Sequence, residues 1–149
     1  MCGIAGLYSA RRVDPELLQR MADVIAHRGP DDSGVWIDAE AGVGFAHRRL
    51  SIIDLSPQGH QPMKSADGWF VLNYNGEIYN HAEIRAELEA RGQAPEGGWR
   101  GHSDTETFVQ AIASWGLEAA VGKAVGMFAF ALWDRKQRIL SLVRDRFGE

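Results

Sequence analysis

Apolar and polar residues along the chain recur with spacings that predict both strands and helices. Residues 3–9 read as a short apolar strand. Asp14 then suits the cap of a helix, and Pro15 suits the first helical position. Two further strands are expected at about 34–37 and 43–47. The apolar residues that give the first helix one buried face are Leu17, Leu18, Met21, Val24 and Ile25.

The second half of the chain continues this mixed pattern. A strand over residues 69–74 ends at Asn75 and Gly76, a pair that favours a tight turn. Ser103 and Glu106 have the spacing of a capping box, in which each residue caps the other at the start of a helix. The helices predicted after residue 79 cover 80–91, 103–115 and 117–123.

Residues 127–133 are continuously apolar rather than alternating. A strand of this kind is covered on both faces. Residues 138–143 form the next predicted strand, which follows a polar turn. Together with the helices, these strands predict a layered α+β fold with buried strands.

Composition narrows the class of protein. The chain has 149 residues, of which 45% are hydrophobic and 24% charged, so we expect one soluble domain. The net charge of −4 and the lack of a basic patch argue against nucleic acid. No apolar run reaches the ~18 residues that cross a bilayer, and no signal peptide is recognisable. The single cysteine favours the cytoplasm, and the scattered histidines predict no metal site.

That cysteine is Cys2, directly after the initiator Met1. Removal of Met1 would place a thiol and a free α-amine on one residue. Free thiols have a pKa of ~8.5 and α-amines of ~7.7–8.0, so such an amine can accept the thiol proton near neutral pH. A terminal amine that activates a side-chain nucleophile is a known arrangement for acyl transfer. The alternative is that Cys2 is an ordinary small residue at a frayed terminus.

Three other positions have one functional and one plain interpretation. Arg49, at a predicted strand end, could bind a carboxylate through two parallel hydrogen bonds, or it could simply be solvated. The Asn75 amide with the neighbouring Gly76 N–H could hold an oxyanion, or the pair could only form a turn. Asp104 could pair with an ammonium group, or it could only stabilise the start of a helix.

Taken together, a set of segments in one order resembles the class II glutamine amidotransferases, which are N-terminal nucleophile hydrolases. The narrower resemblance is to the glutaminase domain of glutamine-hydrolysing asparagine synthetases. The segments that carry the resemblance are Met1-Cys-Gly-Ile-Ala-Gly6, His27-Arg-Gly-Pro-Asp-Asp-Ser-Gly34, Arg49-Leu-Ser-Ile-Ile-Asp-Leu55, Gly59-His-Gln-Pro-Met63, Tyr74-Asn-Gly-Glu-Ile-Tyr-Asn-His81, Ser103-Asp-Thr-Glu106, Gly126-Met-Phe-Ala-Phe-Ala-Leu-Trp-Asp134 and Arg144-Asp-Arg-Phe-Gly-Glu149.

The resemblance implies a four-layer αββα sandwich and a set of site residues. Cys2 would be the nucleophile, with Asn75 and Gly76 as the oxyanion hole. Arg49 would bind the α-carboxylate of glutamine, Asp104 its α-ammonium with help from Glu77, and Arg28 would support the nucleophile. The residues expected to bind substrate are Arg49, Leu50, Ser51, Ile52, Ile53, Asn75, Gly76, Glu77 and Asp104.

The implied activity is hydrolysis of L-glutamine to glutamate and ammonia through a Cys2 thioester. Residues 1–149 would form the glutaminase domain. Its last strands and a synthetase domain, which uses the ammonia to make asparagine from aspartate, would lie outside this chain. No cofactor is expected here, since ATP and Mg would bind the synthetase domain. The resemblance is compatible with a homodimer of the full-length protein.

Three readings remain open. The parent could be another class II amidotransferase, although the segments 49–55 and 74–81 favour the asparagine synthetases. It could be an asparagine-synthetase-like enzyme with a different acceptor. The chain could also be an inert glutamine-binding or interaction module.

Overall fold

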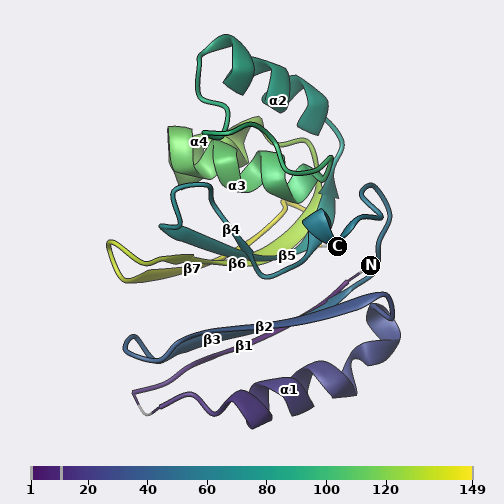
Figure 1. The fold of residues 1–149 in the computed structure, drawn as a ribbon, viewed down its shortest axis with the longest axis vertical. Coiled ribbons are helices and arrows are strands. Elements are labelled where there is room, and N and C mark those ends of the chain that lie inside the picture. The colour runs from purple at the N-terminus through teal and green to yellow at the C-terminus, as the bar shows by residue number, and fades with distance from the viewer. Residues whose placement is uncertain (1, 11, 149) are drawn as a thin grey trace.

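The computed structural model describes residues 2–10 and 12–148. It has four layers: helix α1, a first sheet, a second sheet, and the helices α2, α3 and α4 (Figure 1). The αββα sandwich that the resemblance implied is therefore confirmed. The described helices are α1 (Pro15–Val24), α2 (His81–Ala90), α3 (Asp104–Trp115) and α4 (Leu117–Lys123).

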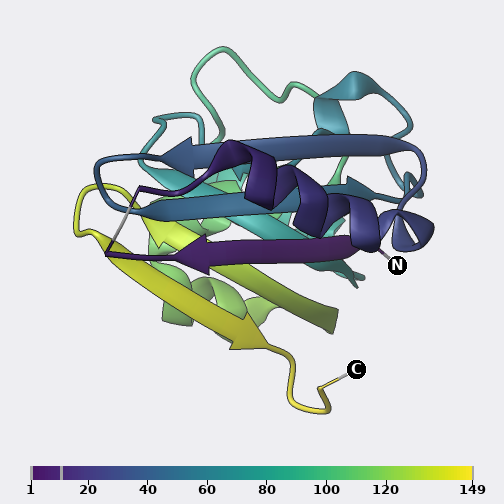
Figure 2. The ribbon, with the colours of Figure 1, turned by 90° about the horizontal axis from the view of Figure 1, so that it is seen from below.

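The first sheet is antiparallel, with the strand order β1-β3-β2 within the described residues. Helix α1 lies across its outer face (Figure 2). Asp14 caps this helix as predicted, since its Oδ1 accepts a hydrogen bond from Glu16 N at 2.9 Å. Leu18 and Ala22 of the helix pack with Ala46 of the sheet. The strands are β1 (Gly3–Tyr8), β2 (Asp32–Asp38) and β3 (Val43–Arg49).

The second sheet is also antiparallel, with the order β4-β5-β6-β7 in the described part of the chain. Strand β6 is covered on both faces, as its continuous apolar sequence predicted. Phe128 and Phe130 pack in the core below the helices, whereas Trp133 packs against Phe45 and Val43 of the first sheet. The strands are β4 (Met63–Lys64), β5 (Phe70–Ile78), β6 (Gly126–Asp134) and β7 (Ile139–Arg144).

The start of helix α3 confirms half of the predicted capping box. Ser103 Oγ accepts a hydrogen bond from Glu106 N at 3.1 Å. The Glu106 carboxylate does not return to Ser103. It is buried and accepts the backbone N–H groups of Arg100 and Gly101, at 2.9 and 3.0 Å. The reciprocal half of the prediction is wrong because the preceding loop offers Glu106 closer donors.

The predicted turn at Asn75 and Gly76 is also wrong. Strand β5 runs straight through both residues, which pair with Ala129 and Phe128 of β6. A Cβ on Gly76 would lie 2.4 Å from the carbonyl oxygen of Met127. The glycine thus serves a close approach between strands, and pairing with β6 overrides the local preference for a turn.

A buried polar contact joins the two sheets. His47 Nδ1 of β3 lies 2.9 Å from Asn73 Oδ1 of β5. Asn73 Nδ2 also donates to the carbonyls of Ala5 in β1 and Ala46 in β3, both at 3.1 Å. One side chain of the second sheet therefore binds two strands of the first.

None of the described helices has the length and apolar character that crossing a membrane requires.

Candidate active site

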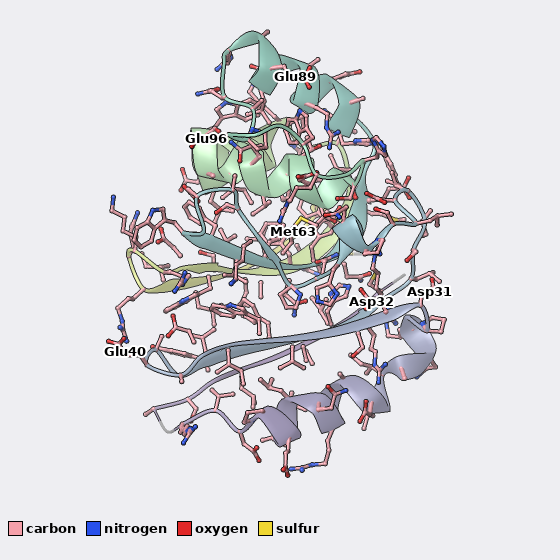
Figure 3. The ribbon with its side chains drawn as sticks, viewed as in Figure 1. Asp31, Asp32, Glu40, Met63, Glu89 and Glu96 are labelled. Carbon is pink, nitrogen blue, oxygen red and sulfur yellow. The ribbon has the colours of Figure 1, made fainter. Side chains whose placement is uncertain are left out.

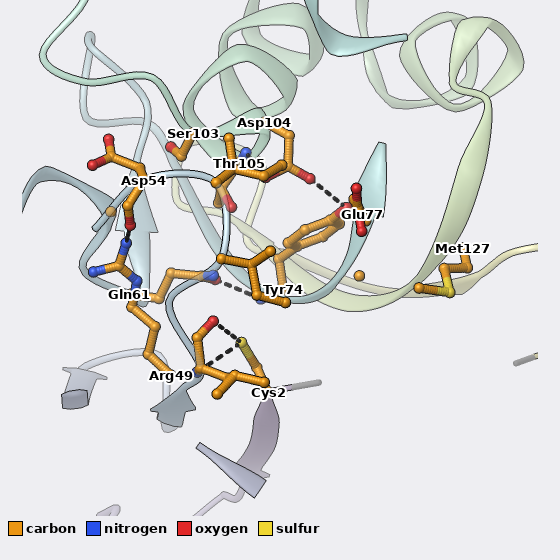
Figure 4. Close-up of a pocket in the computed structure, with 15 residues that line it drawn as sticks. Cys2, Arg49, Asp54, Gln61, Tyr74, Glu77, Ser103, Asp104, Thr105 and Met127 are labelled. Atoms are coloured by element: carbon orange, nitrogen blue, oxygen red, sulfur yellow. Dashed lines mark hydrogen bonds between the residues drawn. The ribbon is translucent and has the colours of Figure 1, made fainter. Parts of the chain in front are cut away.

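A cavity is lined by Cys2, just before β1, and by Arg49 at the end of β3 (Figure 4). Asp31 and Asp32 lie at this end, and Glu40 lies at the opposite end (Figure 3). Segments far apart in the sequence contribute to the cavity wall. Of the residues expected from the sequence, those that line it are Cys2, Arg49, Leu50, Ile52, Ile53, Gly76, Glu77 and Asp104.

Cys2 lies immediately before β1, and its sulfur faces the backbone of Leu50 (Figure 4). Leu50 N lies 3.4 Å from Sγ, and the Leu50 carbonyl oxygen lies 3.7 Å from it. Arg28 Nε donates to the Cys2 carbonyl oxygen at 3.0 Å, so Arg28 contacts the region that it was expected to support. Met1 lies outside the described residues.

Arg49 is the last residue of β3, and only 7% of it is exposed. It is therefore not a solvated residue at a strand end. Its Nη1 donates to the Ser56 carbonyl at 3.0 Å, and its Nη2 donates to the Asp54 carbonyl. A guanidinium has five N–H donors, so this arrangement leaves donors for a ligand. Gly59 packs against the same group, since a Cβ there would lie 1.9 Å from Nη2.

Asp104 is the first residue of α3 and is buried. Its Oδ2 accepts from the Tyr74 hydroxyl and from Ile78 N, both at 3.0 Å (Figure 4). Its Oδ1 accepts from Thr105 N at 2.9 Å. Burial, and then the adjacent Asp104 carboxylate, raises the pKa of Tyr74 well above its ordinary value, so the hydroxyl stays a donor. Asp104 is therefore fixed in place with capacity for one more donor.

Asn75 and Ser51 do not line this cavity among the described residues. Alternation along β5 puts Asn75 on the same face as Asn73, which binds the first sheet, and Gly76 on the opposite face. The buried Asn75 Oδ1 has no hydrogen-bond partner within the described part of the chain. Ser51 N instead donates to Asp31 Oδ2 at 2.7 Å, at a separate depression of the surface.

Sequence reasoning missed several polar residues of the cavity wall. Gln61 is buried, and its Oε1 accepts a hydrogen bond from Tyr74 N at 2.8 Å. Asp54, Gly59 and Ser103 line the cavity too. All four residues belong to segments that carried the resemblance, and that was the available signal. Among the described residues, no group of three or more His, Cys, Asp or Glu side chains is arranged to hold a metal ion.

Comparison with known proteins shows the family to which the chain is similar. The model of a glutamine amidotransferase domain matches residues 1–149. The glutamine-hydrolysing asparagine synthetase 1 of Bacillus subtilis is 41% identical over 99% of this chain and 23% of its own length. A putative asparagine synthetase of Mycobacterium bovis is 39% identical over 99% of this chain and 24% of its own length. The amidase chry2 of Gibberella zeae is 41% identical over 89% of this chain and 19% of its own length.

The chain spans about a quarter of the length of the asparagine synthetases that it matches. The family model covers all 149 residues of the chain. The chain belongs to the glutamine amidotransferase family.

Proposed function

We propose that this chain hydrolyses the side-chain amide of L-glutamine to glutamate and ammonia, with Cys2 as the nucleophile. The observation that carries the proposal is the convergence of Cys2, Arg49 and Asp104 on one cavity. These residues supply a thiol, a cation and a carboxylate from three separate segments. Free glutamine presents the matching groups: an amide carbon, an α-carboxylate and an α-ammonium.

In the proposed complex, Arg49 binds the α-carboxylate through the N–H donors that Ser56 and Asp54 leave unused. Asp104 binds the α-ammonium, with Glu77 on the same cavity wall contributing negative charge. Leu50, Ile52 and Ile53 line the same cavity. An analogue that lacks either charged group would leave a buried Arg49 or Asp104 unpaired, and such mismatches give strong discrimination.

The proposed reaction begins when the thiolate of Cys2 attacks the amide carbon, with the thiol proton passing to the α-amine that Met1 removal exposes. Gly76 N–H and the Asn75 amide hold the oxyanion, and each such donor contributes roughly 3 kcal/mol to the transition state. Collapse breaks the carbon–nitrogen bond, and the protonated amine gives its proton to the departing ammonia. Water then hydrolyses the γ-glutamyl thioester to glutamate. Asn75 would need to turn its amide toward the cavity for this role.

The names of the relatives support a use for the ammonia. In a protein of their length, a synthetase domain would consume it to make asparagine, with ATP and Mg bound there and a homodimer as the oligomeric state. The similarity to an amidase supports a second candidate, in which the ammonia goes to a different acceptor.

The single cysteine favours the cytoplasm as the location.

The test is a glutaminase assay on purified protein whose Met1 removal has been checked by intact mass. We expect equal amounts of glutamate and ammonia from the wild type and none above background from Cys2→Ala, which should still bind glutamine. Val24→Ala, at an exposed position on α1, is the control and should keep full activity. Activity in Cys2→Ala would refute the nucleophile, and binding without turnover in the wild type would identify an inert glutamine-binding module.

A further inference from the structure

We infer that Asp54 is a positioning residue that holds the two charged binding groups of the glutamine site, Arg49 and Asp104, at a fixed separation. The inference rests on the proposed function. Asp54 lies in the loop after β3, is 5% exposed and lines the cavity (Figure 4). Its side chain contacts both of the segments that carry those groups.

On one side, Asp54 organises the loop that holds Arg49. Its Oδ1 accepts from Ser56 N at 2.8 Å and from Ser56 Oγ at 2.6 Å. The carbonyls of Asp54 and Ser56 in turn accept the two Nη groups of Arg49. The carboxylate therefore fixes the loop conformation in which both carbonyls point at the guanidinium.

On the other side, Asp54 holds the approach to helix α3. Its Oδ2 accepts from His102 N at 2.8 Å, two residues before Asp104. A Cβ on Gly101 would lie 2.3 Å from the same oxygen, so the backbone approaches the carboxylate closely. One side chain thus bridges two segments that lie 48 residues apart in the sequence.

The charge of Asp54 strengthens this bridge. Burial would raise the pKa of the carboxyl, but the hydrogen bonds from Ser56 and His102, together with the charge of Arg49, lower it to about 2. Asp54 is therefore ionised at neutral pH, and hydrogen bonds to a carboxylate are roughly twice as strong as neutral ones. An amide in its place has one oxygen, so Asp54→Asn must lose acceptance on either the Ser56 or the His102 side.

The predicted consequence concerns binding more than chemistry. A ligand with two charged ends binds best when both of its partners are already in place, because less ordering remains for the binding step. Loosening the bridge lets Arg49 and Asp104 move independently. The hydrogen-bond contacts of the Cys2 sulfur are with the backbone of Leu50 and not with Asp54. The reactivity of the Cys2 thiol should therefore be unaffected when Asp54 is replaced.

The test is Asp54→Asn, compared by steady-state kinetics with the wild type. We expect KM for L-glutamine to rise about tenfold, the equivalent of one charge-assisted hydrogen bond, with kcat within about twofold. Alkylation of Cys2 by iodoacetamide, which lacks both charged groups of glutamine, should keep its wild-type rate. Ser56→Ala removes only the hydrogen bond from Ser56 Oγ to Asp54 and should raise KM by a smaller factor. This second variant still tests the inference if Asp54→Asn does not fold.

The matched control is Asp67→Asn. Asp67 makes the same kind of contacts in the turn before β5, since its Oδ1 accepts from Ser65 Oγ at 2.5 Å and from Trp69 N at 3.0 Å. KM should not change in this control. An unchanged KM in Asp54→Asn and Ser56→Ala would overturn the inference and leave the proposed function standing. If Asp54→Asn raises KM, lowers kcat and slows alkylation by similar factors, the residue has a general structural role and the inference is overturned. A wild type without glutaminase activity would remove both proposals.

Discussion

Gly59→Ala should separate glutamine binding from stability. Gly59 is buried in the short helical turn at Pro57–Gly59, and its backbone is not left-handed, so alanine suits its conformation. An added Cβ would lie 1.9 Å from Arg49 Nη2, 2.5 Å from Cζ and 3.1 Å from Nε. These atoms are the far end of the Arg49 side chain, and moving them breaks its hydrogen bonds to the carbonyls of Ser56 and Asp54. The guanidinium will therefore swing away and leave the surrounding backbone in place.

The size of the effect follows from what the guanidinium is proposed to bind. A hydrogen bond to a charged group contributes ~1.5–3 kcal/mol. Losing one such bond to the α-carboxylate corresponds to a roughly 10- to 100-fold rise in KM for glutamine. Because ground-state and transition-state binding weaken together, kcat should stay close to the wild-type value. Thermal unfolding should shift by several degrees, since the displaced guanidinium loses its hydrogen bonds to the Ser56 and Asp54 carbonyls while the apolar core stays in place.

The assay is steady-state glutaminase kinetics with a thermal melt on the same preparations. Gly122→Ala is the matched control, because the space around Gly122 is open and the residue lies in helix α4. We expect wild-type KM in this control. A wild-type KM in Gly59→Ala, with the protein folded, would refute the reasoning that Gly59 shapes the Arg49 site.

Two further predictions concern stability. Burial lowers the pKa of His47 to about 4, and the hydrogen bond to Asn73 offsets this only in part. The unfolded state therefore binds the proton more tightly than the folded state. As the pH falls from 6.5 to 4, the free energy of unfolding should decrease by up to about 3 kcal/mol. Urea titrations across this pH range should show a shallower dependence in His47→Gln, and equal slopes would count against the assignment. Gly76→Ala should destabilise the protein by more than about 2 kcal/mol, because the Cβ meets the backbone of β6 at Met127 and Phe128 rather than a flexible side chain. A melting temperature within a few degrees of the wild type would contradict it.

Strands and helices could be predicted from the residue pattern because their signals are local, whereas the four-layer arrangement came from the resemblance. The unbroken apolar run of β6 indicated a strand covered on both faces, and Asp14 with Pro15 marked the start of α1. The turn predicted at Asn75 and Gly76 failed for the opposite reason. What keeps these residues in a strand is the close approach of β6, which lies about 50 residues away in the sequence.

The candidate site shows the same contrast between signals that are local in the sequence and contacts between distant segments. The position of Cys2 made it a candidate nucleophile, and ordered segments of the resemblance indicated Arg49 and Asp104 as candidate binding residues. Asp54 lies in one of these segments, but its bridging role could not be predicted, because nothing in the sequence shows that residue 102 lies beside it. Gly59 likewise needs the position of the Arg49 guanidinium to be understood.

Covalent labelling shows whether Cys2 is the nucleophile that attacks glutamine. The purified protein is treated with an electrophilic analogue of glutamine, and the intact chain and its peptides are weighed by mass spectrometry. We expect one label per chain, on Cys2 of a chain that has lost Met1, and protection by excess L-glutamine. An unlabelled Cys2 on a folded chain without Met1, or labelling that glutamine does not slow, would contradict it.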